Sequence, residues 1–129
     1  MNSALPKWYT RVIGIFFLLV TVSLVTDYFR FGFRPETMHK VFHVALGAIV
    51  VHFGWNSAAW WKAFPVANGG FFCFVGLFGW LFPDFGGLDA FNRLDTVLHS
   101  MVGASGLLIG LLARPSSTTL PEVHTVASN

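Results

Sequence analysis

Four apolar runs follow one another along the chain, separated by short polar or turn-forming segments. A membrane-spanning helix needs about 17–25 predominantly apolar residues, and each run has roughly this length. The pattern therefore predicts an all-α fold, an integral membrane four-helix bundle with spans at about residues 9–28, 38–56, 66–83 and 94–113. Residues 1–8 would form a short N-terminal segment before the bundle.

The third run is the least regular of the four. Pro65 and Pro83 bracket it, and four glycines interrupt it: Gly69, Gly70, Gly76 and Gly79. Glycine is common in membrane helices, where it permits close packing between helices. We therefore expect this run to be a span as well.

Composition supports a membrane location. Hydrophobic residues make up 54% of the 129 residues and charged residues only 11%, whereas soluble domains have roughly 25% charged residues. A soluble core does not explain four such runs with so few charges to cover the outside. Arg114 and Pro115 end the last run, and the Ser/Thr-rich residues 114–129 are predicted to be a disordered tail. The basic residues are too few and too scattered for nucleic-acid binding.

The chain resembles itself at an offset of 56 positions. Without a gap, this offset aligns eight identical pairs, which include His43 with His99, Gly47 with Gly103 and Ala48 with Ala104. Such self-similarity indicates a tandem duplication. Because two helices return the chain to its starting side, the bundle would consist of two parallel two-helix repeats.

The histidines of this repeat open the second and fourth runs. Steps of four residues place side chains on one face of a helix, and such steps connect His39, His43 and Gly47, and likewise Asp95, His99 and Gly103. We expect the second and fourth helices to be the central pair, in close contact at the two glycines, with His43 and His99 face to face. A second small-residue face, at Gly106 and Gly110, is expected to pack within the bundle.

Two interpretations of the histidines remain open. Polar groups inside a membrane need a partner, and the two imidazoles can hydrogen-bond across the helix pair, with His39 and Asp95 solvated at the headgroup level. Alternatively, His43 and His99 bind haem b iron or a divalent metal, with His39 and Asp95 around them. The first interpretation requires no cofactor.

Short motifs within these helices resemble a known family. The segment from His39 to Gly47 resembles the His-Asn-x-x-His-x-x-x-Gly signature of a bacterial family of small four-helix membrane proteins, a domain of unknown function. In that segment Lys40 replaces the Asn of the signature. The segment from Asp95 to Gly103 is similar to the start of that family's last helix. The resemblance implies the four-helix fold and singles out His43 and His99, but it implies no activity.

The sequence contains no nucleophile triad, phosphate-binding loop or paired catalytic carboxylates within the runs. We therefore expect a non-enzymatic accessory or scaffold subunit, which contacts the lipid bilayer and packs in a larger membrane complex or a homo-oligomer. The alternatives are a small haem- or quinone-binding redox protein that uses His43 and His99, or a small oligomeric transporter. Asp and Glu residues lie mostly away from the terminal side, which favours cytoplasmic termini. The family resemblance implies a bacterial inner membrane or a thylakoid membrane.

Overall fold

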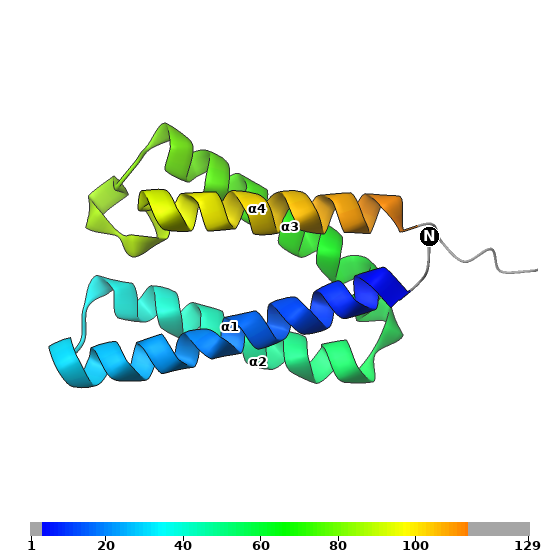
Figure 1. Ribbon diagram of the computed structural model, residues 1–129, viewed down its shortest axis with the longest axis horizontal. Coiled ribbons are helices and arrows are strands. Elements are labelled where there is room, and N and C mark those ends of the chain that lie inside the picture. The colour runs from blue at the N-terminus through cyan, green and yellow to red at the C-terminus, as the bar shows by residue number, and fades with distance from the viewer. Residues whose placement is uncertain (1–3, 114–129) are drawn as a thin grey trace, which may run out of the picture.

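The chain forms an antiparallel bundle of four helices (Figure 1). The computed structural model describes residues 4–113. The helices are α1 (Ala4–Phe31), α2 (Pro35–Asn56), α3 (Ala58–Leu81) and α4 (Arg93–Leu112), with two short 3-10 helices, η1 (Phe85–Gly87) and η2 (Asp89–Phe91), between α3 and α4. The predicted tail at 114–129 and the first three residues of the predicted N-terminal segment lie outside the described residues.

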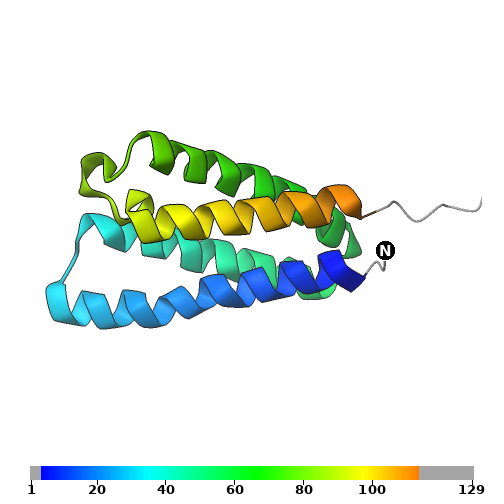
Figure 2. The same cartoon turned by 45° about the horizontal axis from the view of Figure 1, so that its top comes forward.

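Two helical hairpins make up the bundle, α1 with α2 and α3 with α4 (Figures 1 and 2). Ser57 alone joins them: its backbone is extended (φ −135°, ψ 115°), and it ends α2 and precedes α3. The start of α1 and the end of α4 consequently lie at the same end of the bundle (Figure 1). The sequence duplication proposed to underlie the two hairpins remains a prediction.

Local sequence explains the turn inside the first hairpin. Gly32 adopts a left-handed conformation (φ +72°), which glycine adopts without steric cost, and its N–H donates to the carbonyl of Tyr28 at 2.8 Å. Pro35 then occupies the first turn of α2, where its missing N–H would be unpaired in any case. Together these residues end one helix and start the next.

All four observed helices begin earlier than the predicted spans, so residues 4–8, which were expected to precede the bundle, belong to α1. The largest difference is in α3, which begins at Ala58 rather than at about residue 66, so that Pro65 lies inside the helix. Proline removes one backbone hydrogen bond from a helix. Here Pro65 is fully buried, and its carbonyl lies against Gly106 of α4, so packing holds this turn in place.

The bundle has the dimensions and surface of a membrane protein. Three helices, α1, α3 and α4, are long and apolar enough to cross a membrane. Polar side chains lower the hydropathy of α2: His39, Lys40, His43 and His52. It nevertheless runs from the far end of α1 to the near end of α3, alongside the other three helices (Figure 2). Large apolar side chains cover the outer surface, for example Leu19, Val22, Phe74 and Leu111.

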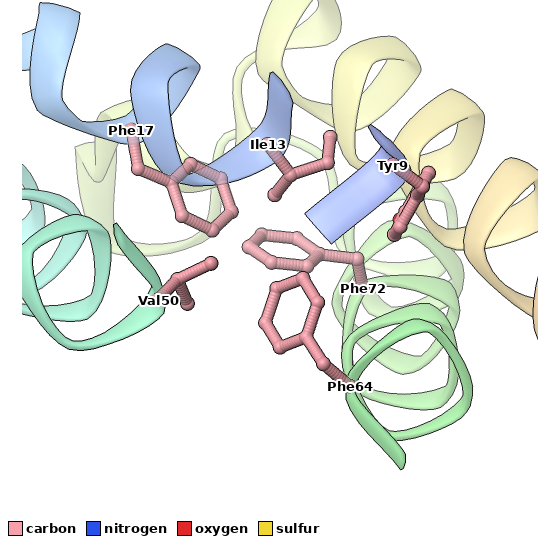
Figure 3. Packing of buried hydrophobic residues seen from close by; sticks show 6 residues of the cluster. All are labelled: Tyr9, Ile13, Phe17, Val50, Phe64 and Phe72. Carbon is pink, nitrogen blue, oxygen red and sulfur yellow. The ribbon is translucent and has the colours of Figure 1, made fainter. Parts of the chain in front are cut away.

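The buried core lies between the hairpins (Figure 3). Its members come from α1, α2 and α3: Tyr9, Ile13, Phe17, Val50, Phe64 and Phe72. The rings of Phe17 and Phe72 lie 5.5 Å apart between centroids. The closest contact between the hairpins is therefore the one between α1 and α3.

The structure differs from the predicted central pair. Gly47 of α2 lies against Phe17 and Leu18 of α1, and Gly103 of α4 lies against Phe72 and Cys73 of α3. Both glycines thus bring helices together within a hairpin rather than between α2 and α4. The expectation of close contact between the second and fourth helices was wrong, because a four-residue spacing defines a helix face but does not identify the helix that covers it. Gly106 and Gly110 likewise face α3.

A buried polar chain connects the two hairpins. The amide of Asn68 in α3 donates to the Tyr9 hydroxyl at 2.9 Å, and this hydroxyl donates to the carbonyl of Val102 in α4 at 3.0 Å. Tyr9 and Asn68 are both buried. Three helices therefore share one hydrogen-bonded chain in an otherwise apolar interior.

Candidate metal centre

Three histidines meet near the end of the bundle that is opposite the termini. The ring centroids of His39 and His43 lie 4.5 Å apart, those of His39 and His99 5.9 Å apart, and those of His43 and His99 6.1 Å apart. One nitrogen from each ring belongs to a group whose members all lie within 4.8 Å of one another. This arrangement brings two histidines of α2 and one of α4 to a single point.

The helices that carry the histidines explain their positions. His39 and His43 are one helical turn apart and share a face of α2. Phe17 of α1 contacts the His43 ring edge-on at 5.2 Å, and Phe72 of α3 lies 5.2 Å from the His99 ring. His43 and His99 are only 8% and 6% exposed. Aromatic packing from α1 and α3 therefore holds the imidazoles inside the bundle.

A backbone hydrogen bond orients one of the three rings. Nδ1 of His43 donates to the carbonyl of His39 at 2.9 Å, which leaves Nε2 of His43 as the nitrogen with a free lone pair. The backbone of Ala90 in η2 lies beside the His99 ring. Metal-binding histidines commonly use their second ring nitrogen in this way, because it fixes the tautomer and the ring orientation.

Two buried ring nitrogens of these histidines have no hydrogen-bond partner. They are Nε2 of His39 and Nδ1 of His99. Buried polar atoms in native proteins are nearly always paired, so these two nitrogens are available to a ligand, an ion or a water molecule. Their position beside His43 places all three rings around one small volume.

A cavity of about 210 Å³ adjoins the three histidines. Polar side chains from three helices also line it: Ser23 of α1, Lys40 of α2 and Asp95 of α4. Asn92 holds Asp95 through both of its side-chain atoms, accepting from the Asp95 N–H at 2.8 Å and donating to Oδ2 at 3.2 Å. Lys40 forms an ion pair with Asp27 of α1.

The structure changes the roles expected for two residues. His39 was expected to lie around the site or at the headgroup level, but it belongs to the same nitrogen group as His43 and His99. Asp95 lines the cavity and is not a member of that group. The four-residue spacing of His39 and His43 already places both rings on one face of the helix, so the sequence indicated that they lie together. Nothing in the sequence indicated that η2 would place Ala90 beside His99.

These donors suit a transition metal. Neutral imidazole nitrogens bind Zn, Cu, Fe and Ni, whereas Mg and Ca prefer oxygen ligands. His39 and His43 belong to one hairpin and His99 to the other, so one ion would bind both hairpins.

No protein-family model, curated protein or solved structure matches this chain. The resemblance to the bacterial domain of unknown function therefore remains a prediction, and the site is interpreted from its own geometry.

Proposed function

We propose that this protein binds one transition-metal ion inside the membrane through His39, His43 and His99. The observation that carries this proposal is the group of three ring nitrogens, one each from His39, His43 and His99, within 4.8 Å of one another. In addition, Nε2 of His39 and Nδ1 of His99 are buried without a hydrogen-bond partner. Leaving a buried polar atom unpaired costs about 1–3 kcal/mol. One bound ion would remove this cost at both nitrogens.

The separation of the nitrogens is compatible with coordination. Zinc binds histidine nitrogens at about 2.0–2.1 Å, which places two ligands of a tetrahedral ion about 3.4 Å apart. The three nitrogens lie within 4.8 Å of one another. Small rotations of the imidazole rings would bring them to coordination distance.

The size of the cavity favours an ion over haem. Pockets for cofactors and other small molecules have volumes of about 300–1,000 Å³, whereas the cavity beside the histidines measures about 210 Å³. The His39 ring also lies 4.5 Å and 5.9 Å from the two rings that would be the axial ligands. A macrocycle between His43 and His99 would collide with it.

Metal analysis of the purified protein tests this proposal. We expect about one zinc, copper, iron or nickel ion per chain after loading, and loss of that ion in His43→Ala and His99→Ala. His52→Ala is the matched control, because His52 lies on the same helix as His43 and is exposed. Metal content that is unchanged in both site variants, or a wild-type protein that binds none of the four ions, would contradict the proposal.

The broader functional expectations from the sequence accompany this proposal. A membrane-embedded metal site suits an accessory subunit of a larger complex, a redox protein or an oligomeric transporter. Cytoplasmic termini are proposed because the acidic side chains Asp27, Glu36, Asp84 and Asp95 lie toward the opposite end. A bacterial inner membrane or thylakoid location follows from the family resemblance.

A further inference from the structure

We propose that the metal centre keeps one coordination position open, and that an exogenous ligand reaches it between α1 and α4. This inference rests on the proposed metal binding. It makes the centre a reactive one rather than a purely structural one. The ligand class is water or hydroxide in the resting state, exchangeable with a small anion.

The number of protein donors is the first support. Three histidine nitrogens form the group, and no cysteine or carboxylate among the side chains that the structure describes belongs to it. Structural zinc sites in proteins almost always have four protein ligands, whereas catalytic sites have three and hold water at the fourth position. A metal bound by these three residues therefore requires a ligand from outside the group.

The cavity supplies room for that ligand. All three histidines line it, so an ion held between them lies at its wall, and its remaining coordination position faces the open volume. At about 30 Å³ per water molecule, 210 Å³ holds about seven waters. The volume is thus large enough for water or for a small anion.

The walls of the cavity indicate its direction of access. Phe16 and Val20 of α1 form one side, and Leu98 and Val102 of α4 form the other. Phe16 and Leu98 are also exposed on the outer surface of the bundle, and α1 and α4 make little contact with each other. The cavity therefore opens between these helices, in the half of the bundle opposite the termini, where Ser23 of its lining is also exposed.

The charges around the cavity determine the kind of ligand. Three neutral imidazoles would add no negative charge to a divalent ion, and an uncompensated charge is costly inside a membrane. The Asp95 carboxylate, which lines the same cavity, would offset one of the two positive charges, and an anionic ligand would offset the other. A bound metal would also make a water ligand more acidic, which favours hydroxide.

Azide binding to the Co(II)-loaded protein tests this inference. We expect one cobalt per chain and a saturable change in the visible spectrum with one azide per cobalt. Val20→Phe and Ser23→Phe, which narrow the cavity, should retain cobalt but weaken azide binding at least tenfold. Val22→Phe, the same change at a nearby exposed position of α1, should leave azide binding unchanged.

Each outcome has a distinct meaning. Cobalt that binds with one ion per chain but gives a spectrum unaffected by azide would show a closed coordination shell and overturn the inference alone. Equal azide affinity in the Val20, Ser23 and Val22 variants would overturn the access route. A wild-type chain that binds no cobalt would overturn the proposed metal binding itself.

Discussion

At Gly103 the backbone of α3 lies so close to α4 that it occupies the space that a side chain would need. A Cβ atom at this position would overlap the backbone and sulfur of Cys73 in α3. Gly70 in α3 differs, because a Cβ there would have no atom within 4 Å. The two glycines are therefore a matched pair for measuring the importance of close helix contact.

We expect Gly103→Ala to destabilise the protein by about 1–3 kcal/mol, because the added methyl group forces α3 and α4 apart. Gly70→Ala should be neutral or stabilise the protein by up to about 1 kcal/mol, through the higher helix propensity of alanine. Thermal unfolding in detergent measures both effects. Equal stability of the two variants would mean that α3 and α4 do not approach each other at Gly103.

The His39→Ala variant tests whether His39 is itself a metal ligand or only a neighbour of the site. Removal of a residue that only orients a ligand lowers metal affinity by about 10–100-fold. We expect His39→Ala to lower the affinity by more than 100-fold, as His43→Ala should, because the His39 nitrogen belongs to the ligand group. Competition with a chromophoric chelator measures the affinity, and a decrease of tenfold or less would place His39 outside the coordination shell.

The sequence identified the helix faces that carry the site, but it did not identify which helices pack against each other. The spacing of His39, His43 and Gly47 correctly places the histidines on one face of α2. The covering helix depends on the fit of side chains, and Phe17 of α1, not α4, covers Gly47. A single sequence does not contain that long-range information in any local pattern.

At the level of helices, the polar chain from Asn68 through Tyr9 to Val102 joins α3, α1 and α4. Interhelical hydrogen bonds in membrane proteins contribute about 0.6 kcal/mol on average and up to about 1.7 kcal/mol. We expect Tyr9→Phe to lower stability by about this amount, because it leaves the Asn68 amide unpaired. Tyr28→Phe, at an exposed position on the same helix, should have no effect on thermal unfolding.

The same chain predicts non-additivity. Asn68→Leu in the Tyr9→Phe background should cost less than it does in the wild type, since its partner hydroxyl is already absent. A double-mutant cycle measures this difference. Additive effects would show that the two side chains act independently.

Helix α2 needs a direct test, because its polar residues leave it outside the set of helices apolar enough to span. If it crosses the membrane, Phe33→Cys and Asn56→Cys, at its two ends, should react with a membrane-impermeant thiol reagent from opposite sides. Cys73 should first be replaced by Ser to remove the background reaction. Labelling of both positions from the same side would show that α2 does not cross.

Helix number was predictable here and helix boundaries were not. An apolar run records only the lipid-facing part of a helix, whereas α3 continues outward through Trp60, Trp61 and Lys62. Such amphipathic side chains are typical of the membrane interface, where they interrupt the run without ending the helix. Pro65 was also misleading as a boundary, because packing of this turn against α4 outweighs the loss of one backbone hydrogen bond.

For the whole molecule, the metal centre would add a link between two hairpins that are covalently joined at Ser57 and already share a buried core. Binding to the folded state alone stabilises it by about 2.7 kcal/mol at 100 times the dissociation constant. If a protease site is inserted at Ser57 and the folded chain is cleaved, the hairpins should separate more slowly with metal than with chelator. His99→Ala should abolish this difference, and equal separation rates in the wild type would contradict a bridging ion.

The order of the ligands along the chain has a consequence for biosynthesis. His39 and His43 enter the membrane with the first hairpin, whereas His99 is supplied by the last helix. A nascent or truncated chain that lacks α4 has only two of the three imidazoles, both on α2. Metal acquisition would therefore follow completion of the polypeptide, and the loaded site would mark a fully inserted chain.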